Sequence, residues 1–117
     1  CDPNDYMSQL KTIFKWYEAW FNSEDFNGCM FKQALEEVIK IYPSTLEPAT
    51  KYKIWLTTLV QGLLTNIGIR NPSHLATLIV SILDGMTIQA HINRHSVDMD
   101  EYWMRVEHLI AFEKALP

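Results

Sequence analysis

Apolar residues recur at spacings of three and four along nearly the whole chain, which predicts α-helices rather than strands. Helix-capping and helix-breaking residues divide this pattern into five segments. The segments cover residues 5–22, 27–43, 46–67, 71–95 and 98 onward. Helices joined by such short connections predict an all-α fold, a five-helix bundle, in one domain of residues 1–117.

Several helix ends are marked by single residues. Asn71 followed by Pro72 predicts a helix start, because Pro is tolerated in a first turn. Asp98, with Glu101 three positions later, resembles a capping box at the start of the last helix. Gly68 is a plausible left-handed stop after the third helix. These signals predict where the chain turns.

The segment of residues 71–95 is apolar nearly all the way round, so it must be covered on more than one side. The joint at residues 96–98 is short and predicts an antiparallel hairpin of the last two helices. We expect this hairpin to pair with a second copy as a dimeric four-helix interface. The expected interface residues are Ile79, Ile82, Gly85, Gln89, Trp103, Val106 and Ile110. Alternatively, the aromatic residues fill the core of a single chain.

Two glycines lie inside strongly periodic helices, Gly62 and Gly85, where each costs about 1 kcal/mol relative to Ala. Either a second helix approaches closely there or space is left for a ligand. A ligand pocket would be mostly apolar with a few polar anchors. The candidate ligand-binding residues are Phe14, Tyr17, Phe31, Leu35, Trp55, Leu59 and Met86. Taken singly, each could also be an ordinary core residue.

Motifs that carry catalysis are missing from the sequence. It contains no nucleophile-elbow pattern, no phosphate-binding glycine loop and no His-Glu-x-x-His zinc pair. His91 and His95 stand four apart on one helical face and could ligate a metal, but no third ligand is evident. We therefore expect no enzyme activity, no metal and no cofactor.

The charge and the cysteine content limit which partners and which cellular compartment are expected. The net charge is -4 and the basic residues are scattered, so no positive surface for nucleic acid is expected. The longest apolar-rich run, residues 75–83, is far shorter than the roughly 20 residues that cross a bilayer. Two cysteines, Cys1 and Cys29, are too few for a disulfide scaffold and favour a reducing, cytoplasmic setting. The first residue, Cys1, suggests a fragment or a processed chain.

Two stretches carry a resemblance to a known family. FNGCMFKQALEEV, residues 26–38, resembles the Gly-Cys-Leu/Met-Phe segment that begins a helix in the regulatory domain of many TetR-family transcriptional regulators. ILDGMTIQAHI, residues 82–92, looks like the penultimate helix of that domain. The hairpin expected after it matches the two helices with which these regulators dimerise. The resemblance covers essentially the whole chain in helix order and length.

The resemblance implies a C-terminal effector-binding and dimerisation domain whose N-terminal helix-turn-helix domain is absent from this chain. A small apolar or amphipathic effector would enter a cavity among the helices and change DNA binding by that missing domain, in a homodimer. Gly28 would let the chain turn into its helix, with Phe31 facing the cavity. Two other hypotheses stay open. One is a helical homodimerisation or adaptor module without a ligand, and the other is a small helical enzyme.

Overall fold

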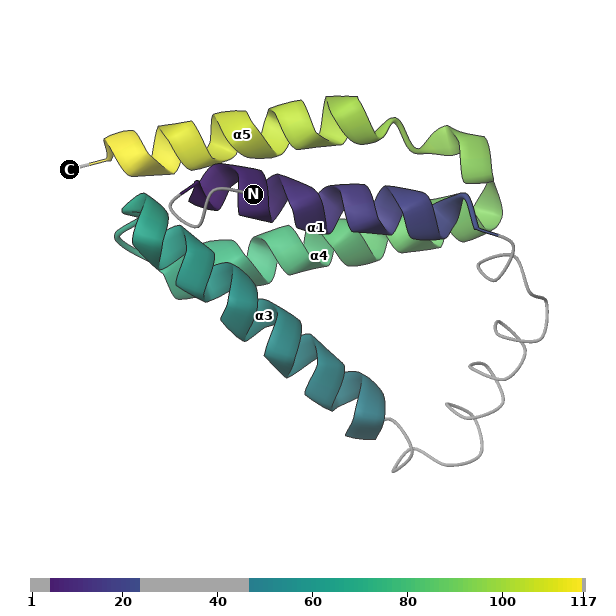
Figure 1. Ribbon diagram of the computed structural model, residues 1–117, viewed down its shortest axis with the longest axis horizontal. Helices are drawn as coiled ribbons and strands as arrows, with labels where there is room; N and C mark the ends of the chain where they lie inside the picture. Colours follow the sequence, from purple (N-terminus) through teal and green to yellow (C-terminus); the bar gives the residue numbers. More distant parts are fainter. Residues whose placement is uncertain (1–4, 24–46, 117) are drawn as a thin grey trace.

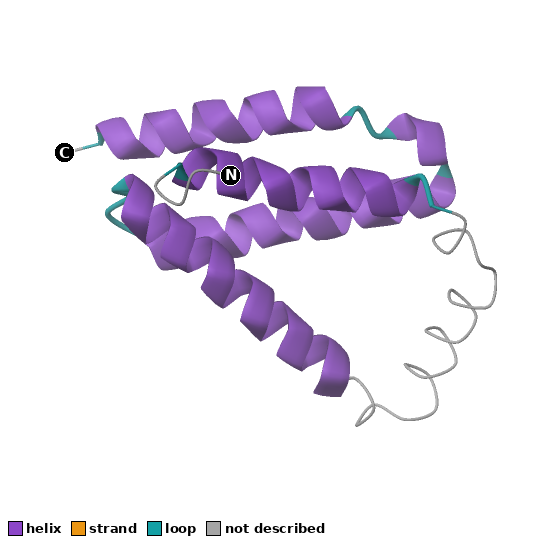
Figure 2. Cartoon of the chain, viewed as in Figure 1, coloured by secondary structure: helices purple, strands orange, loops and turns teal. Residues whose placement is uncertain are grey.

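Four α-helices and one short 3₁₀-helix make up the part of the chain that this computed structural model describes, residues 5–23 and 47–116 (Figure 1, Figure 2). They are α1 (Tyr6–Phe21), α3 (Glu47–Ile67), α4 (Pro72–Ile92), η3 (Arg94–Ser96) and α5 (Met99–Ala115). These residues contain no strand, so the predicted all-α class is confirmed for them. The helix expected over residues 27–43 lies outside the described residues, and the five-helix count stays a prediction.

The two N-terminal caps that start α1 and α5 are side-chain carboxylates. Asp5 accepts a hydrogen bond from the Ser8 backbone N–H at 3.0 Å, and Asp98 accepts one from the Glu101 N–H at 3.2 Å. Each bond satisfies a backbone donor that the first turn leaves without a helical partner. The Glu101 carboxylate accepts from the Arg105 guanidinium at 2.7 Å, one turn further along α5. The predicted start of the last helix is confirmed.

The turn between α3 and α4 also follows the local signals. Gly68 has a φ of +107°, in the left-handed region that glycine adopts without strain. The backbone N–H groups of Gly68 and Ile69 both donate to the Leu64 carbonyl at 3.1 Å, which ends α3. Pro72 is the first residue of α4, as predicted.

α4 ends three residues earlier than the sequence pattern predicts. Its last helical residue is Ile92, not His95. The side chain of Asn93 accepts a hydrogen bond from the His95 backbone N–H at 3.0 Å and caps the short η3. Asn competes for backbone groups in this way, so it favours a helix end over a helix interior.

α1 packs against both of the last two helices of the chain. Figure 1 shows α4 and α5 pointing in opposite directions, with α1 running alongside both. α5 makes more extensive contact with α1 than with α4. The last two helices are thus antiparallel and joined by η3, but α1 supplies much of what covers them.

The hydrophobic core lies among α1, α3, α4 and α5. Phe14 is fully buried and its ring centroid lies 5.2 Å from that of Trp103. Ile79, Trp103, Val106 and Ile110, all assigned above to a dimer interface, are at most 5% exposed within this one chain. They are core residues of a single copy, because α1 and α3 cover α4, and α1 covers α5, along the apolar faces that the spacing marks. Their assignment to a surface between copies is corrected.

One face of α4 keeps apolar side chains on the surface. Leu78, Ile88 and Ile92 are 47%, 60% and 76% exposed, and Gly85 and Gln89 are also exposed. By length and composition alone, α4 is the one described helix that could cross a membrane. Core helices of soluble proteins pass the same test, and α4 contributes buried side chains along its length.

Neither helix glycine has a close neighbour among the described residues, 5–23 and 47–116. A Cβ built on Gly62 or on Gly85 would have no heavy atom within 4 Å, apart from the local backbone. The close helix approach expected at these positions is therefore not found among the helices that the structure describes.

The core assignment predicts a large difference between two phenylalanines. Phe14→Ala should lower the free energy of unfolding by about 3–5 kcal/mol, because it removes a fully buried ring and leaves a cavity. Phe112→Ala is the matched control, since Phe112 is 64% exposed and its loss should change stability by less than about 0.5 kcal/mol. Urea unfolding followed by circular dichroism measures both. Equal losses would contradict the core described above.

Candidate functional site

An apolar groove lies between α1 and α3, with a volume of about 420 Å³. Trp16 on α1 and Trp55 on α3 are 57% and 59% exposed, so the groove opens to solvent. Its lining residues are Thr12, Ile13, Trp16, Tyr17, Tyr52, Trp55, Leu56 and Leu59. Two helices that are distant in sequence thus supply its two walls.

The groove exists because α3 leaves the bundle toward its N-terminal end, as Figure 1 shows. Tyr52, Ile54 and Trp55 in the first half of α3 are 42%, 61% and 59% exposed. The buried side chains described on α3 come later in the helix and are Leu56, Val60, Leu63 and Leu64. The later residues hold α3 in the core, and the earlier ones are free to line a surface groove.

A second hollow of about 360 Å³ continues the first. It shares Trp16, Tyr17 and Tyr52 with the first hollow and adds charged residues from α3 and α4. Its lining residues are Trp16, Tyr17, Trp20, Tyr52, Lys53, Asp84 and Thr87. We call the two hollows together the aromatic groove. It is apolar at one end and carries a charged pair at the other.

The walls of the aromatic groove are built from ring contacts within each helix. On α1, the rings of Trp16 and Trp20 stack with centroids 6.0 Å apart, and Trp16 meets Tyr17 edge-on at 5.5 Å. On α3, the centroids of Tyr52 and Trp55 lie 5.9 Å apart. Such pairs are worth about 0.5–1.5 kcal/mol beyond the area they bury, so each wall is held in place by its own rings.

Two tyrosine hydroxyls meet where the two hollows join. The hydroxyl oxygens of Tyr17 and Tyr52 are 3.5 Å apart, and either can donate. Burial raises the pKa of Tyr17 well above its usual range, and the Tyr52 hydroxyl and the Asp84 charge raise it further. Tyr17 is therefore neutral at physiological pH.

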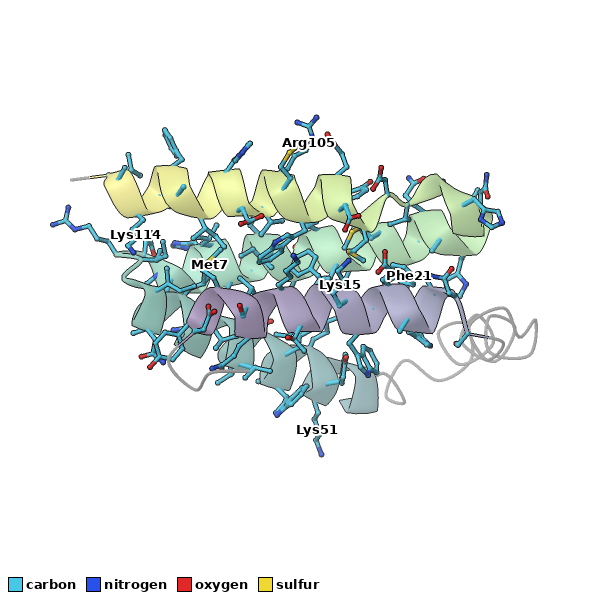
Figure 3. The ribbon with its side chains drawn as sticks, turned by 45° about the horizontal axis from the view of Figure 1, so that its top comes forward. Met7, Lys15, Phe21, Lys51, Arg105 and Lys114 are labelled. Atoms are coloured by element: carbon cyan, nitrogen blue, oxygen red, sulfur yellow. The ribbon has the colours of Figure 1, made fainter. Side chains whose placement is uncertain are left out.

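The charged end of the groove is an ion pair between α3 and α4. The Lys53 ammonium donates to the Asp84 carboxylate, and the two side chains are 44% and 39% exposed. Because water screens both groups, such a pair stabilises the fold by at most about 1 kcal/mol. Figure 3 shows Lys51, two residues earlier on α3, pointing away from the bundle instead.

Three of the predicted ligand-binding residues come together in this groove: Tyr17, Trp55 and Leu59. Phe14 and Met86 do not line it, because they are 0% and 1% exposed in the core. Helical spacing alone marks the apolar face and does not separate its buried centre from its exposed edge. The predicted residues Phe31 and Leu35 lie outside the described residues.

Sequence reasoning missed Trp16, Tyr52 and the Lys53–Asp84 pair as site residues. A signal for the aromatic ones was present, because Trp16 and Trp20 are four apart and Tyr52 and Trp55 are three apart, which places each pair on one helix surface. No comparable signal existed for the ion pair, since its partners are 31 residues apart.

Other charged and histidine side chains are not part of this site. Within residues 5–23 and 47–116, no three His, Cys, Asp or Glu side chains gather as a metal site. Lys15 extends from α1 toward α5 (Figure 3) and donates to Asp100 at 3.0 Å and Glu18 at 3.4 Å. The bond to Asp100 raises the pKa of Lys15. This contact ties α1 to the first turn of α5.

Comparison with known proteins finds no matching family model, no similar curated protein and no similar solved structure. The function must therefore be argued from the groove and from the sequence motifs.

The buried Tyr17 hydroxyl predicts a loss of stability at alkaline pH. An unfolded tyrosine ionises near pH 10, whereas the folded Tyr17 keeps its proton because its pKa is raised. The stability that Tyr17 contributes to the fold is therefore complete below about pH 10 and is lost as the pH rises further. The free energy of unfolding should fall more steeply from about pH 9 to pH 11 in the unaltered protein than in Tyr17→Phe. Urea titrations at both pH values measure this. Parallel losses would mean that Tyr17 ionises as freely as an exposed tyrosine.

Proposed function

We propose that the aromatic groove binds a small apolar or amphipathic molecule. The observation that supports this is a pair of tryptophans, Trp16 on α1 and Trp55 on α3, that line the same hollow of about 420 Å³ and are each more than half exposed. Ligand sites commonly have volumes of about 300–1,000 Å³ and mostly apolar walls with a few polar groups. Contiguous exposed apolar surface on a folded protein marks an interaction site.

The polar groups of the groove suit binding better than catalysis. Tyr17 is neutral, and the charges of Lys53 and Asp84 are engaged with each other. A nucleophile next to an activating base is the usual mark of covalent catalysis, and the described lining residues contain no such pair. We therefore propose a binding module and not an enzyme.

Together with the resemblance to TetR-family regulators, the groove supports an effector-sensing and dimerisation domain of a TetR-like, cytoplasmic regulator. Its walls belong to α1 and α3, so a ligand that prefers one separation of these helices would shift their arrangement. Such coupling is typically about 1–3 kcal/mol. DNA would be contacted only by a helix-turn-helix domain encoded upstream of Cys1, which this role requires.

For the homodimer that belongs to this role, we propose an interface on the outer face of α4. The residues on that face recur at spacings of three and four and are Leu78, Ile82, Gly85, Gln89 and Ile92. Gly85 lies at the middle of this stripe and has no side chain to keep a second helix away. The same stripe also supports the second candidate function, a helical homodimerisation or adaptor module without a ligand.

Ligand binding is tested by calorimetry with a panel of small apolar, amphipathic and charged compounds. At least one should raise the melting temperature, and Trp55→Ala should weaken its binding by about tenfold, because half of the aromatic wall on α3 is lost. Phe112→Ala, an exposed aromatic on α5 remote from the groove, is the control and should bind normally. If no compound shifts the melting temperature, the module without a ligand is the better interpretation.

The interface is tested by adding one methyl group. Gly62→Ala and Gly85→Ala should each stabilise their helix by up to about 1 kcal/mol, since neither new Cβ meets an atom of the described part of the chain within 4 Å. If a second copy packs closely on α4, only Gly85→Ala should weaken the dimer. Sedimentation equilibrium over a concentration series measures this. A dimer that responds equally to both substitutions, or a monomer throughout, would contradict the proposed interface.

A further inference from the structure

We infer that the ligand of the aromatic groove is an organic cation, with its positive charge next to an aromatic or apolar body. This inference rests on the proposed function of the groove as a ligand site and adds the class of ligand. Three features of the groove support it: the aromatic walls, the position of the carboxylate and the reach of its lysine partner.

The walls offer electron-rich ring faces from both helices. The five aromatic lining residues are Trp16, Tyr17, Trp20, Tyr52 and Trp55. A cation within about 6 Å of such a ring is attracted by roughly 0.5–1 kcal/mol at exposed sites and by more when desolvated, and Trp is the best partner. An anion over the same ring faces is repelled, so the walls already distinguish the two signs of charge.

The two charged side chains of the groove differ in length, and this difference favours a cation. The Asp84 carboxylate is carried by a single methylene well inside α4, so its position follows the helix. The Lys53 ammonium ends a flexible four-carbon stem on the half of α3 that leaves the bundle, and its side chain is 44% exposed. A ligand cation can take the place of the ammonium while Lys53 turns into water. A ligand anion at Lys53 would still face the fixed carboxylate.

The negative charge of Asp84 also reaches into the groove. It contributes to the raised pKa of Tyr17, whose hydroxyl lies where the two hollows join. Lys53 and Asp84 are the charged residues among the described lining. A bound cation would therefore place its charge at Asp84, and its apolar body between Trp16 and Trp55.

Two ions of the same shape and opposite charge, tetraphenylphosphonium and tetraphenylborate, test directly whether the groove prefers a positive or a negative ligand. Titration calorimetry should show the phosphonium binding at least about tenfold more tightly than the borate. Asp84→Asn should weaken phosphonium binding by about fivefold or more and leave the borate almost unchanged. Lys53→Gln should leave phosphonium binding equal or tighter, since it removes the competing ammonium. Both variants should remain folded, because the ion pair is exposed and contributes little stability.

Each other outcome overturns either the cation inference alone or the proposed function as well. Equal affinity for the two ions, with Asp84→Asn having no effect, would show that the groove selects by shape and apolar area, and the cation inference fails while the proposed function stands. Tighter borate binding, lost in Lys53→Gln, would make Lys53 the anchor and also overturn the inference. If neither ion binds but an uncharged or anionic panel compound does, the ligand class is wrong. If nothing binds, the proposed function fails as well.

Discussion

The packing of α1 against both α4 and α5, with Phe14 on Trp103, is the constraint on which the rest of the structure depends. The two ring centroids are 5.2 Å apart and both side chains are buried. Because the helices of one chain bury the inner faces of α4 and α5, the exposed apolar residues of α4 lie on its outer face, at Leu78, Ile88 and Ile92. α3 contacts α4 more extensively than it contacts α1. The first half of α3 diverges from α1, and the groove opens between these two helices.

The ends of the described helices could be predicted from sequence because their causes are local. The Asp98 cap, the left-handed Gly68 and the first-turn Pro72 each act within a few residues of their own position. The partners of the helices could not be predicted in this way. The apolar spacing of Trp103 and Val106 does not reveal whether their own chain or a second copy covers them.

Only part of the candidate site could be predicted from the sequence, for a related reason. Tyr17 and Trp55 could be selected because large aromatic residues on a helix can line a cavity, although each taken singly was more readily a core residue. Met86 was selected by the same logic and lies in the core, since residue type does not report depth. The Lys53–Asp84 pair joins two helices, and it becomes visible only when their relative placement is known.

Three of the four tryptophans are divided between two environments by this arrangement, which gives the protein an internal optical reporter. Trp103 is in the dry core, whereas Trp16 and Trp55 face water in the groove. Their emission should therefore separate into a short-wavelength and a long-wavelength component. Occupation of the groove would alter the second component alone, and global unfolding would move the first, so a single spectrum would distinguish a bound molecule from a damaged fold.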